Sequence, residues 1–253
     1  ITAEHLYTCY ETFYHPSNML LFVVGAVNPE EMMTYIREHQ NKKEFAEFKP
    51  IKRSFPNEPL EVAKQENKLF MDVQKPKVYV GLKAKETSVQ GYAMMKHEMG
   101  IQLALELIFG RSSDFYVQAY EKGWIDESYA FDFTLEKGYG FAIIGSDTSK
   151  PKELVEAIKK ELKKVEEKWP FGQSDLDRVR KKKIGYFLRA LNSVEYIANQ
   201  FTRYAFNDMD LFDAVPALEQ ITVADLQNAF ASIQGENQQT VFSVLPKKEQ
   251  ETS

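Results

Sequence analysis

An internal repeat constrains the fold of this chain more than any other feature of its sequence. Residues 1–25 align with residues 221–245 at a constant offset of 220, without a gap. The identical pairs are Ile1/Ile221, Thr2/Thr222, Leu6/Leu226, Phe22/Phe242 and Val24/Val244. The spacing of apolar residues also agrees, which is typical of a tandem repeat of one structural unit. The alternative interpretation is that any capped helix followed by a buried strand produces similar spacing.

On the repeat interpretation, the first 40 residues are the end of a unit. The predicted elements are a helix capped by Thr2 over residues 3–14, a strand buried on both faces over residues 19–24, and a helix capped by Asn28 over residues 29–41. Residue 1 is Ile and not Met. We therefore expect residues 1–40 to be the C-terminal remnant of a preceding homologous domain, followed by a Pro-rich and Lys-rich linker over residues 41–60.

We predict one complete domain over residues 61–246 and a disordered tail over residues 247–253. The predicted strands cover residues 62–73, 77–84, 126–135, 139–146 and 240–245. The predicted helices run from Thr87 or Ser88 to Phe109, from Ser112 or Ser113 to Lys122, over 152–168, from Ser174 or Asp175 to Asn207, and onward from Thr222. This order pairs strands locally. It predicts an α+β fold in two layers, with an antiparallel-rich sheet covered by helices on one face.

Composition excludes several classes of function. Acidic and basic residues are mixed along the chain at a net charge of −5, so we expect no nucleic-acid partner. The longest apolar run, Met19 to Val27, is far shorter than the ~20 residues that cross a bilayer, so we expect no membrane partner. The run Arg178 to Lys183 is interpreted as a solvated helix face. Cys9 is the single cysteine, which suits a reducing cytoplasm, and it falls on the apolar stripe of the first helix, where we expect it to be packed.

Several segments resemble the pitrilysin/insulinase family of zinc metallopeptidases, the inverzincins with the motif H-x-x-E-H. The matching segments are Tyr14-His15-Pro16-Ser17-Asn18-Met19, Leu21 to Glu31, Phe109 to Tyr116, Glu121 to Ile125, Ile143 to Asp147, and Asp177-Arg178 with Arg189 to Ser193. The resemblance implies tandem homologous domains of the insulinase and processing-peptidase type. It places residues 1–40 at the end of the zinc-bearing domain and the remainder in the non-catalytic domain.

The zinc motif itself is missing from this sequence. The four histidines are His5, His15, His39 and His97, and none forms H-x-x-E-H. Two imidazoles one helical turn apart are needed to hold the metal, with the intervening Glu acting on its bound water. We therefore expect no catalytic residue and no metal ligand in this chain, and zinc only in the parent protein.

The resemblance also implies a substrate clamp of one Arg and one Tyr in the second domain. The matching positions here are Tyr120 and, depending on the gap, Asp126 or Tyr129. The Arg is missing, and the Tyr is present only with a shifted register. Tyr129 and, more weakly, Tyr120 are the candidate substrate contacts.

The resemblance implies the inactive C-terminal domain of an insulinase-like zinc endopeptidase, which in that family forms half of a peptide-degrading chamber. Its partners would be the N-terminal catalytic domain, or a homologous subunit, and a peptide substrate. The alternative is a non-catalytic partner subunit or scaffold of the same family, and a third interpretation is an unrelated α+β domain. An upstream H-x-x-E-H would favour the enzyme.

Overall fold

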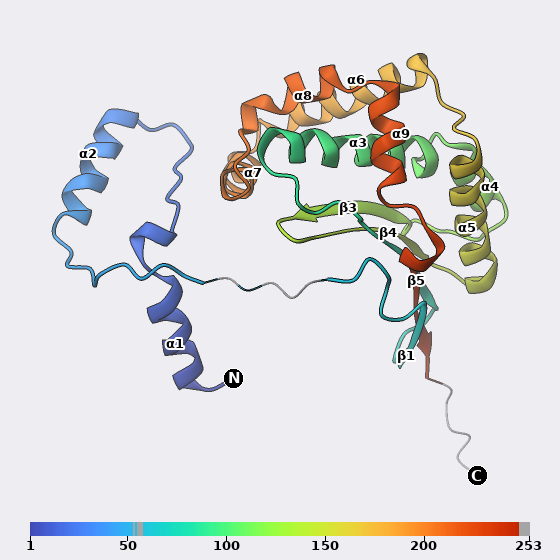
Figure 1. Ribbon diagram of the computed structural model, residues 1–253, viewed down its shortest axis with the longest axis horizontal. Helices are drawn as coiled ribbons and strands as arrows, with labels where there is room; N and C mark the ends of the chain where they lie inside the picture. Colours follow the sequence, from blue (N-terminus) through green and yellow to red (C-terminus); the bar gives the residue numbers. More distant parts are fainter. Residues whose placement is uncertain (53, 55–57, 248–253) are drawn as a thin grey trace, which may run out of the picture.

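The computed structural model describes residues 1–52, 54 and 58–247. Most of them form one body of a sheet and helices, whereas α1 (Ala3–Phe13), a short 3-10 helix and α2 (Pro29–Gln40) lie to one side of it (Figure 1). Apart from Lys247, the tail predicted at residues 247–253 lies outside the described residues. The division into a remnant, a linker and one complete domain stays a prediction.

The sheet has five strands in the spatial order β1-β5-β2-β4-β3. Their bounds are β1 Glu66–Met71, β2 Lys77–Lys83, β3 Ala130–Glu136, β4 Tyr139–Asp147 and β5 Gln239–Pro246. All neighbouring strands are antiparallel except β1 and β5, which run parallel with Glu66 opposite Val241. The sheet is thus antiparallel-rich, as predicted, with one parallel pair at its edge.

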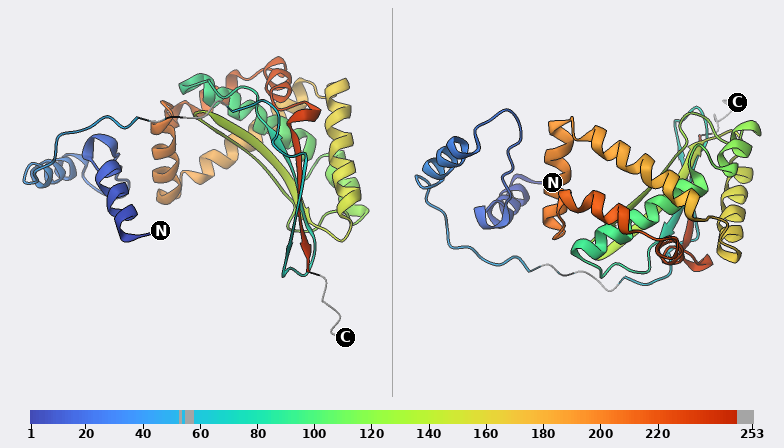
Figure 2. Two further views of the ribbon diagram at one scale, coloured as in Figure 1. Left: turned by 60° about the horizontal axis from the view of Figure 1, so that its bottom comes forward. Right: turned by 90° about the horizontal axis from the view of Figure 1, so that it is seen from above.

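The helices cover one face of this sheet (Figure 2). Their bounds are α3 Gly91–Phe109, α4 Asp114–Glu121, α5 Pro151–Glu167, α6 Gln173–Ala190, α7 Val194–Phe206, α8 Ala214–Gln220 and α9 Val223–Ala231. Helix α3 is the centre of the helical layer, and α9, β3, α6 and α8 all pack against it. The predicted two-layer α+β fold is confirmed.

The alternation of buried and exposed side chains along β2 shows which face of the sheet the helices cover. Val78, Val80 and Leu82 are almost fully buried, whereas Tyr79 is 36% exposed. Because successive side chains of a strand point to opposite faces, Tyr79 marks the face without helices. This second face of the sheet is open.

Most predicted helix caps are confirmed. The hydroxyl groups of Thr2, Ser113 and Thr222 and the side-chain oxygen of Asn28 each accept a hydrogen bond from a backbone N–H of the first helical turn. The cap predicted at Thr87 or Ser88 is wrong. Helix α3 begins after Gln90, which makes no side-chain capping bond, and burial of α3 on nearly all sides stabilises it instead.

The long helix predicted to reach Asn207 is also wrong, because it is two helices. Helix α6 ends at Ala190, and α7 begins again at Val194 with Ser193 as its cap. The Ser193 hydroxyl accepts a hydrogen bond from the Tyr196 N–H at 3.2 Å. The apolar periodicity alone predicts that the helix continues through this region. The capping residue Ser193 lies inside that periodic pattern and starts a new helix instead.

The basic run on α6 is solvated only in part. Arg180 reaches under α8, where its Nε donates to the Leu218 carbonyl at 2.9 Å and an Nη donates to the Ile221 carbonyl. Lys183 is partly buried, and its Nζ donates to Gln102 Oε1 at 2.8 Å. These two residues join α6 to its neighbours.

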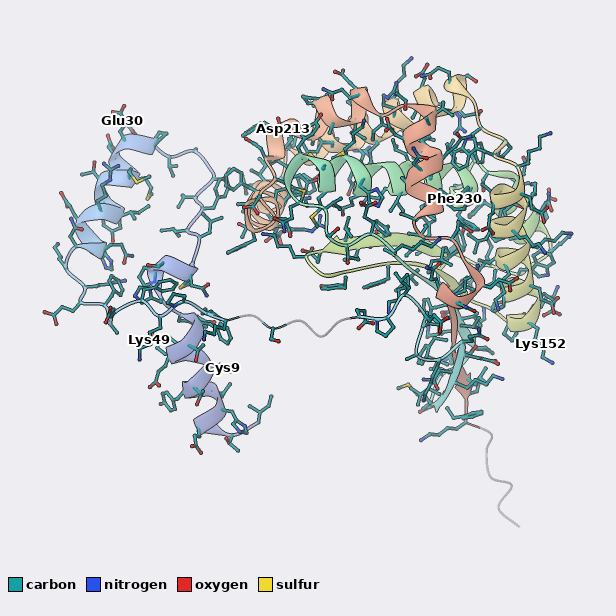
Figure 3. All side chains as sticks on the ribbon, in the orientation of Figure 1. Cys9, Glu30, Lys49, Lys152, Asp213 and Phe230 are labelled. Carbon is teal, nitrogen blue, oxygen red and sulfur yellow. The ribbon has the colours of Figure 1, made fainter. Side chains whose placement is uncertain are left out.

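The prediction of a buried strand over residues 19–24 is wrong for this structure. These residues form neither helix nor strand, and Leu21 is 64% exposed. Cys9 is exposed as well, contrary to the prediction that it is packed, and Figure 3 shows it on α1 away from the main body. Cys9 is exposed because α1 buries none of its residues against the described part of the chain.

No helix in the described ranges combines the length and the apolar character that crossing a lipid bilayer requires.

Candidate functional site

Tyr120 and Tyr129, the two candidate substrate contacts, lie on either side of a third tyrosine. Tyr120 is at the end of α4 and is 59% exposed, with its ring stacked on Tyr116 at a centroid distance of 6.1 Å. Tyr129 precedes β3, and its ring centre is 5.6 Å from that of Tyr116. Folding therefore brings the two predicted residues to one aromatic cluster.

The two tyrosines differ in what their hydroxyl groups can reach. Tyr129 is only 9% exposed, and its hydroxyl donates a hydrogen bond to the Phe109 carbonyl at 2.9 Å. Burial raises the pKa of Tyr129, because the interior disfavours the phenolate. Tyr129 thus holds the end of α3 in this structure, and Tyr120 presents the accessible ring. A role in substrate contact stays a prediction for both.

Asp126, the other position that matches the expected clamp, is an ionised carboxylate in a turn. Its Oδ1 accepts hydrogen bonds from the Ser128 hydroxyl at 2.6 Å and from the Ser128 N–H at 2.9 Å, and Lys75 Nζ lies 3.4 Å from Oδ2. The bonds from Ser128 lower the pKa of Asp126, with a smaller contribution from Lys75. Asp126 therefore organises the turn before β3.

The open face of the sheet carries an apolar groove that the sequence analysis missed. The groove has a volume of about 430 Å³. Its lining residues are Val62, Tyr79, Gly81, Leu82, Lys83, Phe141, Ile143, Thr240 and Phe242. The available signal was Tyr139, Phe141 and Ile143 at alternate positions of β4, but periodicity does not tell which face the helices cover.

Buried charges lie on the opposite, helical side of the sheet. The Glu98 carboxylate is 4% exposed and lies 2.9 Å from Arg203 Nη2, while Arg203 Nε donates to Glu136 at 3.0 Å. Burial raises the pKa of Glu98 even though Arg203 opposes that change. Arg203 Nη2 also donates to the Leu135 carbonyl at 3.2 Å. These bonds connect α7 to α3 and β3.

The residues that the structure describes do not fit a zinc site. In the described part of the chain, no group of three or more His, Cys, Asp or Glu side chains comes close enough to hold a metal ion. His97 and Glu98, the sequence pair nearest to the motif, have other partners: His97 Nε2 lies 3.2 Å from the Ser232 hydroxyl, and Glu98 pairs with Arg203. No catalytic step through zinc can be assigned to these residues.

Comparison with known families gives a direct match. The model of the peptidase M16 inactive domain matches residues 1–183. The chain belongs to the M16 peptidase family. It is a domain of the inactive kind, as the resemblance predicted, and it lacks the catalytic site of the family.

Curated relatives agree with this assignment. The M16 domain is 51% identical over 247 residues to the uncharacterized zinc protease YmfH of Bacillus subtilis, covering 98% of this chain and 57% of the relative. It is 23% identical over 256 residues to the zinc protease PqqE of Helicobacter pylori, covering 97% of this chain and 55% of the relative. The chain thus spans a little more than half the length of these relatives.

Solved structures show the same fold. An M16-like peptidase from Alicyclobacillus acidocaldarius superposes with a TM-score of 0.87 at 30% identity, covering 98% of this chain and 59% of that one. The inactive peptidase domain of a zinc protease from Bordetella parapertussis superposes with a TM-score of 0.56 at 15% identity, covering 73% of this chain and 98% of that one. The second match concerns the fold alone.

Proposed function

We propose that this M16 domain is the non-catalytic C-terminal part of a zinc-dependent endopeptidase of the pitrilysin/insulinase type. In this proposal it forms half of a chamber in which peptides are degraded. The H-x-x-E-H motif and the zinc ion belong to an N-terminal catalytic domain of the parent protein. The names of the relatives and the share of their length that this chain covers support the proposal.

The open sheet face is the observation that supports a wall of the chamber. Three antiparallel strands, β2, β4 and β5, present Tyr79, Phe141, Ile143 and Phe242 on a face that no helix covers. A monomeric domain rarely exposes a contiguous apolar surface without a binding role. An apolar groove with little side-chain charge suits unfolded peptides of varied sequence, and peptide is the proposed substrate.

The test uses the parent protein with single substitutions in this groove. Phe141→Ser and Ile143→Ser are expected to raise KM for a quenched peptide several-fold and to leave the zinc content unchanged. Tyr186→Ser, an exposed aromatic change on α6 away from the groove, is the matched control. Unchanged KM in both groove variants would contradict a peptide-binding wall.

A second experiment tests the proposed role of the predicted contacts. If Tyr120 holds substrate, Tyr120→Ala raises KM in the parent enzyme while the unfolding temperature stays the same, because the ring is exposed. If the parent lacks the zinc motif and shows no turnover, the alternative of a non-catalytic subunit or scaffold replaces the enzyme.

Residues 1–40 are proposed to complete the preceding domain, with 41–60 as linker and 61–246 as the second domain. Exposed apolar residues of α1, Leu6, Tyr10 and Phe13, support this, since they are suited to a core that the rest of this chain does not supply. The Bordetella domain structure matches 73% of this chain over 98% of its own length, which supports a unit about the size of residues 61–246.

Cys9 provides a direct measurement of that arrangement. It is exposed in this chain and is the only cysteine, so a thiol reagent should modify it rapidly. In a parent protein from which any other cysteines have been removed, we expect the reagent to modify Cys9 much more slowly, because the preceding domain covers α1. Equal rates in chain and parent would contradict the proposal. A cytoplasmic location is also proposed, supported by the use of one unpaired cysteine.

A further inference from the structure

Unpartnered buried polar atoms gather in one place, far from the open sheet face. In the described part of the chain, four buried side-chain atoms lack a hydrogen-bond partner: Trp169 Nε1, Gln234 Nε2, Gln234 Oε1 and Gln238 Oε1. Three of these four belong to residues that line the same pocket. Leaving a buried donor or acceptor unpaired is costly, so this concentration indicates a site for a polar partner.

The pocket has a volume of about 340 Å³ and lies between α5 and α9. Its lining residues are Lys85, Val165, Glu166, Trp169, Gln227, Phe230, Ala231 and Gln234. Phe230, labelled on α9 in Figure 3, has its ring centre 5.8 Å from that of Trp169. Val165 and Phe230 are each 2% exposed. Rigid packed side chains therefore hold the Trp169 indole in position.

Gln234 gives the pocket its hydrogen-bonding character. The residue is 3% exposed, and its carboxamide offers one acceptor and an NH₂ donor that no residue in the described ranges uses. Trp169 adds a second donor, the indole N–H. The edge of a cis amide, with a carbonyl oxygen and an N–H on the same side, supplies an acceptor and a donor that match these groups.

The charges at the pocket favour a neutral ligand. Lys85 and Glu166 contribute one charge of each sign, and both are exposed. Lys85 Nζ is occupied, since it donates to the Ala231 carbonyl at 3.2 Å. The floor is apolar, which fits the planar faces of a small uncharged molecule.

We propose that the pocket between α5 and α9 binds a small neutral molecule through a cis-amide edge, which pairs with the Gln234 carboxamide and the Trp169 indole N–H. Two chemical sources carry that edge: a primary carboxamide, as in an Asn or Gln side chain, and a lactam ring, as in uracil. The site lies on the helical side of the domain and is separate from the open sheet face.

The experiment follows indole N–H resonances of the ¹⁵N-labelled full chain during titration with acetamide, uracil or N,N-dimethylacetamide. The chain has two tryptophans, so Trp124 serves as an internal reference. A saturable shift of the Trp169 resonance with acetamide or uracil is expected, and the arm that saturates identifies the source. N,N-dimethylacetamide has no N–H and should produce no saturable shift.

Variants separate binding from structure. Gln234→Leu should weaken binding by about tenfold or more, because it removes both amide partners. Gln238→Leu is the matched control, since it also removes a buried unpartnered oxygen but lies outside the pocket lining, and binding should persist. If Gln234→Leu does not fold, Gln234→Met, an uncharged side chain of similar length that also lacks both amide partners, takes its place.

Three results would overturn the site. These are a titration without saturation for both acetamide and uracil, an equal shift with N,N-dimethylacetamide, and unchanged binding in the Gln234 variant. Any of them would mean that internal water alone is the partner of these buried atoms.

Discussion

Arg203 is the residue on which three elements depend for charge balance. It lies on α7, pairs with Glu98 of α3 and Glu136 of β3, and is partly covered. Asn207 donates to the second oxygen of Glu136 at 2.9 Å, so that carboxylate has partners for both oxygens. A buried carboxylate with one cationic partner tolerates the loss of that partner poorly.

Arg203→Met is therefore expected to lower the free energy of unfolding at pH 7 by about 2–4 kcal/mol. Burial already raises the pKa of Glu98, and loss of the guanidinium raises it further. When the pKa of a carboxyl group is higher in the folded than in the unfolded protein, its contribution to stability is fully present below the unfolded pKa. This contribution is lost as the pH rises through the folded pKa. The penalty of the substitution should thus shrink between pH 7 and about pH 4, as urea unfolding at both values would measure.

Lys137→Met provides the control for Arg203→Met. Lys137 forms a more exposed ion pair with Asp208 at 2.9 Å. Its loss is expected to change the unfolding free energy by less than about 1 kcal/mol at either pH. Equal effects of the two substitutions would show that burial does not distinguish these pairs.

Tyr129→Phe tests the bond between the Tyr129 hydroxyl and the Phe109 carbonyl. Loss of this buried bond should cost about 1 kcal/mol at pH 8. Because the folded pKa of Tyr129 is raised, the wild type should also lose stability as pH rises above about 10. The variant should lose less over that range, and the difference between the two proteins isolates Tyr129.

Tyr120→Phe, which removes an exposed hydroxyl, is the comparison and should be neutral at both pH values. A stability loss as large as that of Tyr129→Phe would contradict the positions assigned to the two residues.

At the scale of elements, helix caps were predictable from sequence and helix lengths were not. Short polar residues before an amphipathic segment correctly indicated α1, α2, α4 and α9. The break between α6 and α7 was missed, although Asn192-Ser193 is itself a typical cap sequence. An apolar period continues across that turn, and only tertiary packing decides where the helix ends.

Ser193→Ala is expected to destabilise the domain by about 1 kcal/mol, because the first turn of α7 loses its capping oxygen. Ser174, the cap predicted for α6, is the matched control, since α6 begins after Gly172 and Ser174 is exposed inside the first turn. Ser174→Ala should leave the unfolding midpoint in urea unchanged. The reverse order of effects would favour the continuous helix.

The candidate site was predictable only in part, for a related reason. The alignment of motifs pointed to Tyr120 and Tyr129, and these residues do meet at one cluster through Tyr116. Which hydroxyl is buried depends on the path between α4 and β3. The open-face groove depends on which side of the sheet the helices cover. Neither the burial of a particular hydroxyl nor the position of the groove can be read from the spacing of apolar residues along the sequence.

At the scale of the whole molecule, the first 50 residues contribute few contacts to the main body. Phe22 stacks on Phe201 with ring centres 4.1 Å apart, while α1 and α2 bury no residue. A chain that begins at residue 51 is therefore expected to unfold in urea within about 1 kcal/mol of the longer one. It should also self-associate less in sedimentation, because exposed apolar side chains are removed.

Removal of residues 239–253 is the comparison for that truncation. It takes away β5, which lies between β1 and β2, and should abolish cooperative unfolding. If instead the chain that begins at residue 51 loses its cooperative transition, the first 50 residues belong to the same folding unit.

The position of β5 has a consequence for synthesis in the cell. β5 is the last strand of this sheet in chain order and yet an inner strand, and β1, which is synthesised before the other strands, pairs with it in parallel. Until β5 has been synthesised, β1 and one edge of β2 have no neighbouring strand, and pairing between strands so far apart in the chain is slow. The partly synthesised sheet is thus exposed to aggregation and proteolysis until β5 emerges from the ribosome.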